Sequence, residues 1–201
     1  MTARIDSSPL DTRSVEVNLT RVMIVTLFGR YRGGLQLVSA AGQSLRLLDL
    51  LNYPQRLQPG GAGGVGRSAP GLVLSQSSRS DLRRSEEFPC GDSLTLRPES
   101  IVLAWEEEAN EQTSTARVAA LGYEKRVAAE KGRVFIHQVN GLRLEGSLAG
   151  GLVALEPGRM AGKSFVPLTE VILIDPVIAS APVFIPFAAV NVHHAESFGA
   201  L

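Results

Sequence analysis

Four residues of types that bind metal ions are candidates for a site in this sequence: His137, His193, His194 and Glu196. A zinc site needs three or four ligands that converge from fixed elements. His193 and His194 are adjacent, and neighbouring residues of a strand point to opposite faces of a sheet, so the two imidazoles do not converge on one ion. We therefore predict no metal site and interpret these histidines as surface or interface residues.

Nucleophilic and cofactor chemistry would need patterns that the sequence does not supply. Cys90 is the single cysteine, so it cannot form an intramolecular disulfide, and we predict no catalytic role for it. The segment Gly61–Gly66 (GAGGVG) matches the dinucleotide-binding pattern, but Pro59 precedes it where a strand is needed and Pro70 follows where a helix is needed. No nucleophile elbow is visible. We predict no catalytic residues and no cofactor.

A basic and aromatic triplet is the one candidate binding site: Arg30, Tyr31 and Arg32. Proteins that bind single-stranded nucleic acid combine a basic groove with exposed stacking rings, and this triplet has both components. Further arginines follow at Arg79, Arg83 and Arg84. The chain as a whole has a formal net charge of zero, which argues against a general polyanion binder. The alternative interpretation of the triplet is a solvated strand face with one inward-facing ring.

A hairpin pattern that occurs twice predicts the elements that position these residues. Arg133–Leu148 alternates apolar and polar residues around Asn140-Gly141, a pair typical of a type I′ turn between two strands. Arg21–Gln36 matches it without gaps at an offset of 112 residues, as from Arg21 to Arg133. The repeat predicts two related β-units.

The remaining segments complete this domain organisation. Helical spacing of leucines predicts a short helix over Gln43–Asn52, and alternation predicts strands over Ser93–Trp105, Phe165–Asp175 and Phe184–His194. The predicted fold class is mainly β: two duplicated small β-barrel or β-sandwich units with a connecting helix. The predicted boundaries are a disordered arm over 1–14, a first β-unit over 15–110 with a mobile insertion over 54–89, the connecting helix over 111–132, and a second β-unit over 133–201.

The most apolar stretch, Val171–Val190, approaches the length of a membrane helix. Three prolines within it, Pro176, Pro182 and Pro186, oppose a helix, so we predict buried or interface strands and no membrane span. The first residues of the sequence contain no apolar signal-peptide region, which predicts a cytoplasmic location.

The chain resembles a known family in three patterns: the hairpin, the leucine-rich segment that ends LLDLLN, and the strands that begin F-[VI]-P-[LF]. It is similar to an uncharacterised bacterial family of small β-domains of the Sm-like or SH3-like barrel type. The resemblance covers Arg21–Asn52 and Arg133–His194, and it implies two diverged barrel copies without catalytic residues. The second copy departs from the pattern, because Gly150–Gly162 stands where the leucine-rich helix would be.

These observations predict a non-enzymatic binding or assembly module that associates with itself or with another protein. Strand edges that need a partner and the lack of a catalytic pattern motivate this prediction. One alternative is an Sm-like nucleic-acid-binding protein that uses Arg30, Tyr31 and Arg32. A second alternative is a small-ligand carrier or an enzyme with a site between the two units.

Overall fold

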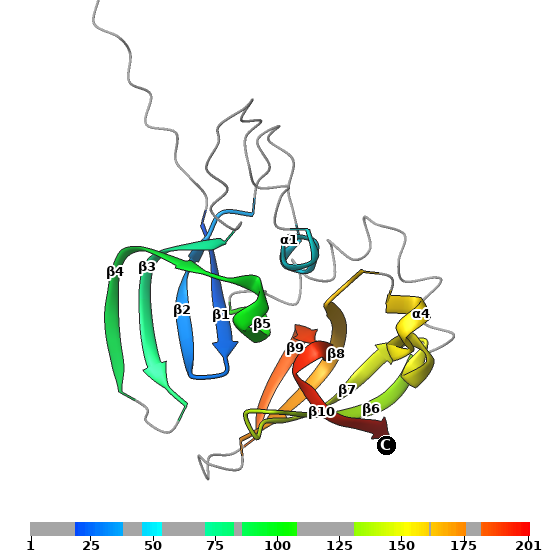
Figure 1. The fold of residues 1–201 in the computed structure, drawn as a ribbon. Coiled ribbons are helices and arrows are strands. Elements are labelled where there is room, and N and C mark those ends of the chain that lie inside the picture. The colour runs from blue at the N-terminus through cyan, green and yellow to red at the C-terminus, as the bar shows by residue number, and fades with distance from the viewer. Residues whose placement is uncertain are drawn as a thin grey trace, which may run out of the picture.

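The computed structural model describes residues 19–37, 46–53, 71–82, 86–107, 131–160, 162–175 and 182–201. Within these ranges the fold is mainly β, and ten strands form one antiparallel sheet (Figure 1). The strands are β1 (Thr20–Thr26), β2 (Gly29–Leu35), β3 (Leu72–Asp81), β4 (Glu87–Leu96), β5 (Ile101–Glu106), β6 (Lys131–Gln138), β7 (Arg143–Ala149), β8 (Phe165–Ile174), β9 (Val183–Asn191) and β10 (Ala195–Ala200).

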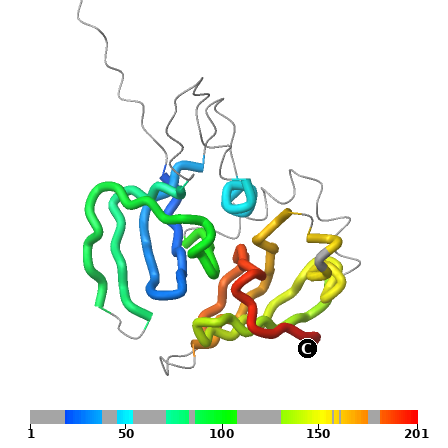
Figure 2. Tube along the Cα trace, viewed as in Figure 1, coloured from blue at the N-terminus to red at the C-terminus, as the bar shows by residue number. Residues whose placement is uncertain are grey.

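The order of strands across the sheet is β10-β6-β7-β8-β9-β5-β1-β2-β3-β4. The first five strands therefore appear as β5-β1-β2-β3-β4 and the last five as β10-β6-β7-β8-β9, which is the same order. We call these sets the first half and the second half. The two halves lie beside each other and meet along β5 and β9, as the traces in Figures 1 and 2 show.

Strand registers also correspond between the halves. In the first half Val22 pairs with Glu106 and Val25 pairs with Leu103. At the equivalent positions of the second half, Val134 pairs with Ala200 and His137 pairs with Ser197. Both pairings then skip one residue, at Val102 in β5 and at Glu196 in β10.

A β-bulge recurs at one glycine in each half. Opposite Gly33, β3 carries an extra residue, and Gln76 there has a φ of 48°. Opposite Gly146, β8 does the same, and Glu170 has a φ of 54°. A Cβ on Gly33 or Gly146 would lie 3.1 Å from the carbonyl oxygen of the residue before the extra one, so the close strand approach favours glycine. Such bulges bend a strand and increase its twist.

The predicted type I′ turn at Asn140-Gly141 is wrong, although the hairpin is present. Only Gly141 of this pair has a positive φ, of 86°. The Gly141 amide donates to the Gln138 carbonyl at 2.8 Å, and the Gln138 amide donates to the Leu142 carbonyl at 2.8 Å. A three-residue loop that ends in a left-handed glycine is the next most common hairpin connection. The match between the two hairpin sequences at an offset of 112 residues therefore holds only in the first strand. In the second strand the structural equivalents are one residue further apart, as Gly33 and Gly146 show.

The short helix is confirmed over Leu47–Asn52 (α1), where Leu47, Leu50 and Leu51 are buried. The part of the predicted helix before position 46 lies outside the described residues. In the second half, a 3₁₀ helix at Gly151–Leu155 and a single turn of α-helix at Pro157–Met160 (α4) occupy the segment where the sequence lacks the leucine pattern.

The predicted mobile insertion over 54–89 is wrong where the structure describes it. Residues 72–81 form β3, and β4 begins at Glu87, so this segment supplies two strands of the sheet. Polar β3 residues such as Ser75, Ser77 and Ser80 conceal the apolar alternation that identifies strands in sequence. Residues 54–70 and 83–85 lie outside the described residues.

The predicted strand over Ser93–Trp105 is interrupted. Pro98–Ser100 form a 3₁₀ turn between β4 and β5. The connecting helix predicted over 111–132 falls outside the described residues except at its end, where Lys131 already belongs to β6. The arm over 1–14 is also outside them.

Two hydrophobic clusters fill the molecule, and each takes residues from both halves. The cluster of the first half includes Phe165 from β8 and Ala189 from β9. The cluster of the second half includes Val25, Val102 and Leu103 from β1 and β5. Among the described residues, no helix is long and apolar enough to cross a membrane.

The bulge glycines give a stability prediction. We expect Gly33→Ala to lower the free energy of unfolding by about 1 to 3 kcal/mol, because the new methyl group would crowd Ser75, Leu74 and Ser77. Gly158→Ala is the matched control, since no atom lies within 4 Å of a Cβ there. Urea unfolding followed by circular dichroism measures both. Equal stability of the two variants would contradict the role of Gly33.

Candidate functional site

The structure places the predicted binding triplet on β2, where acidic residues already engage both arginines. Arg30 forms an ion pair with Asp175, which follows β8 in the other half. The Arg32 guanidinium donates to Glu107 at 2.8 Å and to Glu87 at 3.0 Å. These carboxylates reduce the positive potential that a phosphate backbone would need.

Tyr31 is half-buried, and its ring is covered by another arginine. The Arg79 guanidinium carbon lies 5.9 Å from the centre of the Tyr31 ring, and Arg79 also pairs with Asp81 at 3.3 Å. The ring face on that side is therefore not open to a stacking base. Arg83 and Arg84 lie outside the described residues.

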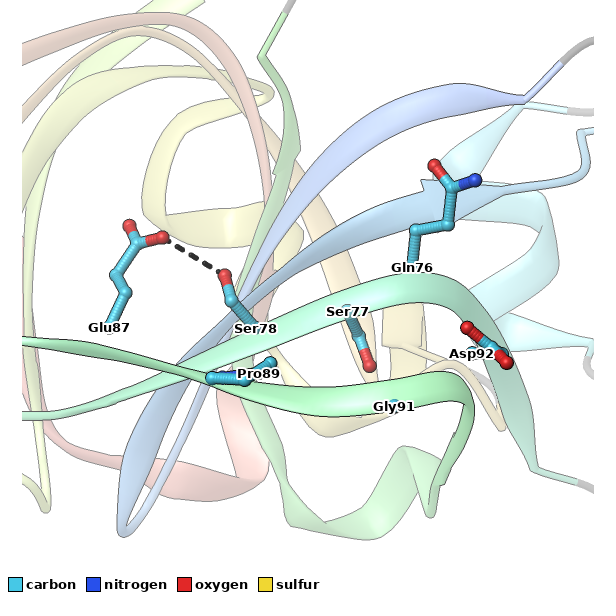
Figure 3. Close-up of a pocket in the computed structure, with 7 residues that line it drawn as sticks. All are labelled: Gln76, Ser77, Ser78, Glu87, Pro89, Gly91 and Asp92. Atoms are coloured by element: carbon cyan, nitrogen blue, oxygen red, sulfur yellow. Dashed lines mark hydrogen bonds between the residues drawn. The ribbon is translucent and has the colours of Figure 1, made fainter.

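A polar groove runs along the outer pair of strands, β3 and β4, with a volume of about 440 Å³ (Figure 3). Its lining residues are Gln76, Ser77, Ser78, Glu87, Pro89, Gly91 and Asp92. Glu87 is already bound by Ser78 at 3.0 Å and by Arg32 at 3.0 Å. The described lining residues include no histidine, lysine or cysteine, and the carboxylate that faces the Ser78 hydroxyl is already bound by Arg32.

His194, His137 and Cys90 each have a different polar neighbour in the fold. His194 Nε2 lies 2.7 Å from the Glu99 carbonyl oxygen, and His137 Nδ1 lies 3.2 Å from Ser197 Oγ. The Cys90 thiol lies 3.8 Å from the Phe88 carbonyl oxygen. In the part of the chain that the structure describes, no three histidine, cysteine or carboxylate side chains gather to hold a metal ion.

The joint between the two halves is a contact surface within the chain. β5 and β9 pair antiparallel, with Leu103 opposite Val190 and Ala104 opposite Ala189. All four side chains are fully buried. The joint therefore combines backbone pairing with apolar burial, the two contributions that make an added strand bind.

Helix α1 of the first half holds the start of β8 through one asparagine. Asn52 Nδ2 donates to the Phe165 carbonyl oxygen at 3.0 Å. Asn52 Oδ1 accepts from the Ser164 amide at 3.1 Å and from the Phe165 amide at 2.9 Å. The Phe165 side chain is buried in the cluster of the first half. We call this contact the Asn52 clamp.

Further contacts between the halves surround the joint. Asn191 Nδ2 donates to the Ile101 carbonyl oxygen at 2.8 Å, and Asn140 Nδ2 donates to the Thr26 carbonyl oxygen at 3.4 Å. The ion pair between Arg30 and Asp175 belongs to the same set. Arg30 therefore forms one of the contacts between the halves.

The two outermost strands, β4 and β10, each have one neighbour within the described sheet. Each of these strands carries an exposed aromatic residue: Phe88 on β4 is 51% exposed and Phe198 on β10 is 48% exposed. Phe184 on β9, within the stretch predicted to form buried or interface strands, is 63% exposed. An outer strand offers unpaired backbone amide and carbonyl groups to another strand.

Sequence reasoning did not identify Asn52 or Asn191 as joint residues. An asparagine at a helix end is usually a local cap, and nothing in the sequence shows that Asn52 reaches a strand more than a hundred positions away. No family model, curated protein or solved structure matches this chain.

The Asn52 clamp predicts a coupling between α1 and β8. Asn52→Ala removes three hydrogen bonds from partly buried groups, and we expect a loss of about 2 kcal/mol in the free energy of unfolding. The Ser164 and Phe165 amides should also exchange with deuterium faster. Asp49→Ala, which removes the surface ion pair with Arg46 from the same helix, is the control and should change stability far less. Unchanged amide protection would refute the clamp.

Proposed function

We propose that this protein is a non-enzymatic assembly module that binds partners by adding a strand to the open edges of its sheet. The observation that carries the proposal is the joint itself, where the fifth strand of one half pairs with the fourth strand of the other. β4 is the fourth strand of the first half, and β10 is the fifth strand of the second. Each lies at an open edge of the described sheet.

We further propose that the halves are diverged copies of one small β-barrel-like unit. Three correspondences support this: the strand order, the skipped residues Val102 and Glu196, and the bulges opposite Gly33 and Gly146. If the halves are copies, the edge surfaces of one half are related to the joint surfaces of the other. The edge of β9, which binds β5 in the joint, then has a counterpart in β4, which lies at the open edge of the described sheet.

The alternatives receive less support from the described residues. An enzyme or a small-ligand carrier would need a pocket with converging functional groups, and the groove on β3 and β4 contains no such set. A nucleic-acid binder would need exposed basic and aromatic groups, whereas Arg30, Tyr31 and Arg32 are engaged by other side chains. Strand addition is favoured over these alternatives because the described sheet has two open edges, β4 and β10.

Strand addition can be tested with a peptide of residues 98–107, which contains β5, the strand that occupies a fourth-strand edge in the joint. We expect it to change the amide chemical shifts of Leu94–Leu96 in the isotope-labelled full chain, because these residues correspond to the part of β9 that β5 contacts. The control is the same peptide with alternate backbone nitrogens methylated, which keeps the side chains and removes donors. Equal shifts from both peptides, or none, would contradict edge docking.

The ion pairs of Arg32 predict weak binding to nucleic acid. We expect little binding of a fluorescent single-stranded RNA at low salt, and tighter binding by Glu87→Gln/Glu107→Gln, which removes the two carboxylates bound to Arg32. Glu99→Gln/Glu156→Gln is the control, with the same net charge but changes elsewhere on the exposed surface. Fluorescence anisotropy measures all three. Tight, salt-dependent binding by the unmodified chain would instead favour the nucleic-acid alternative.

A further inference from the structure

We infer that the partner of the open edges is a second copy of this chain, bound head to tail. In this arrangement β10 of one copy pairs with β4 of the next in the register that β5 and β9 use inside the chain. The inference rests on the proposed strand-docking function and names its partner. It follows from the correspondence of residues between the halves and from the charges that this correspondence brings together.

The correspondence is fixed residue by residue through the observed registers. Ser75 lies opposite Gly34 and Ser93, and Thr169 lies opposite Ser147 and Phe187, which aligns Ser75 with Thr169. The same spacing of 94 residues aligns β4 with β9 and β5 with β10. Both edges of the described sheet are therefore counterparts of strands that already pair in the joint.

Transferring the joint register to the two edges gives specific contacts between copies. Leu103 opposite Val190 becomes Ser197 opposite Leu96, and Ala104 opposite Ala189 becomes Phe198 opposite Thr95. Phe198 is 48% exposed in the single chain. Pairing would cover part of this aromatic surface.

Continuing the register by one residue brings opposite charges together. In the joint the same step leads from Leu103 and Val190 to Val102 and Asn191, and the Asn191 side chain donates to the neighbouring Ile101 carbonyl oxygen. The counterparts at the edges are Glu196 and Arg97. Both are exposed, and neither forms an ion pair with another described residue. A directly opposed Glu–Arg pair stabilises an antiparallel register and penalises the alternatives.

The contact between copies would be weaker than the joint within the chain. β5 presents Ile101, Val102, Leu103 and Ala104 fully buried, whereas the equivalent run of β10 is Ala195 to Phe198 and includes Glu196 and Ser197. The segment after β7 also lacks an equivalent of the Asn52 clamp, because the 3₁₀ helix and α4 occupy that place. Assembly should therefore depend on protein concentration.

Because β4 and β10 are different surfaces, the contact is heterologous. Every added copy leaves one β4 edge and one β10 edge free until the rotation between copies closes a ring. The same geometry makes the pair Glu196 and Arg97 occur once at every contact, so a charge change affects all contacts equally.

Charge reversal tests the inference in the full chain. We expect light scattering over a range of concentrations to show assembly of the unmodified chain, and Glu196→Arg or Arg97→Glu alone to raise the concentration of half-assembly about 5- to 10-fold. The double variant should restore assembly. An equimolar mixture of the two single variants should also assemble, since each reversed residue then faces an opposite charge. Glu156→Arg, a charge reversal at an exposed residue outside β4 and β10, is the control.

The outcomes distinguish strand docking in general from docking of a second copy of this chain. A chain that stays monomeric at every concentration, while the peptide of residues 98–107 still shifts Leu94–Leu96, would refute the second copy and leave strand docking in place. Assembly that both single reversals leave unchanged would refute the β10-to-β4 contact. Failure of the peptide together with a monomeric chain would refute strand docking as well.

Discussion

The pairing of β5 with β9 is the interaction on which the arrangement of the sheet depends. It is the one link between two sets of five strands in the described sheet order. Ala104 and Ala189, opposite each other, are small and fully buried, so the backbones can approach while larger neighbours pack around them. Without this pairing the described strands would form two sheets, each with two open edges.

The joint is also a region where the halves exchange core residues. Phe165 of the second half completes the cluster of the first, and Val102 of the first half belongs to the cluster of the second. Asn52 fixes the same region by satisfying three backbone groups at the start of β8. Apolar burial stabilises the contact, and the directional hydrogen bonds define one relative position of the halves.

Curvature of each half depends on a repeated local device. A glycine in the second strand, Gly33 or Gly146, permits close approach of the third strand, which carries an extra residue with positive φ. Gln76 and Glu170 adopt this unfavourable conformation because the surrounding strand pairings require it. The same local arrangement therefore occurs in both halves.

The sequence by itself determined the mainly β class, the two hairpins and the short leucine-rich helix, because alternation and helical spacing are local properties. It did not reveal β3, whose polar residues conceal its pattern, or the turn at Asn140, where one added loop residue changes the register. Only the tertiary structure showed that Arg30 binds Asp175 and that Asn52 holds β8, because those partners are distant in sequence. Local patterns identify strands but do not say which strands pair, and contacts between distant residues decide the pairing.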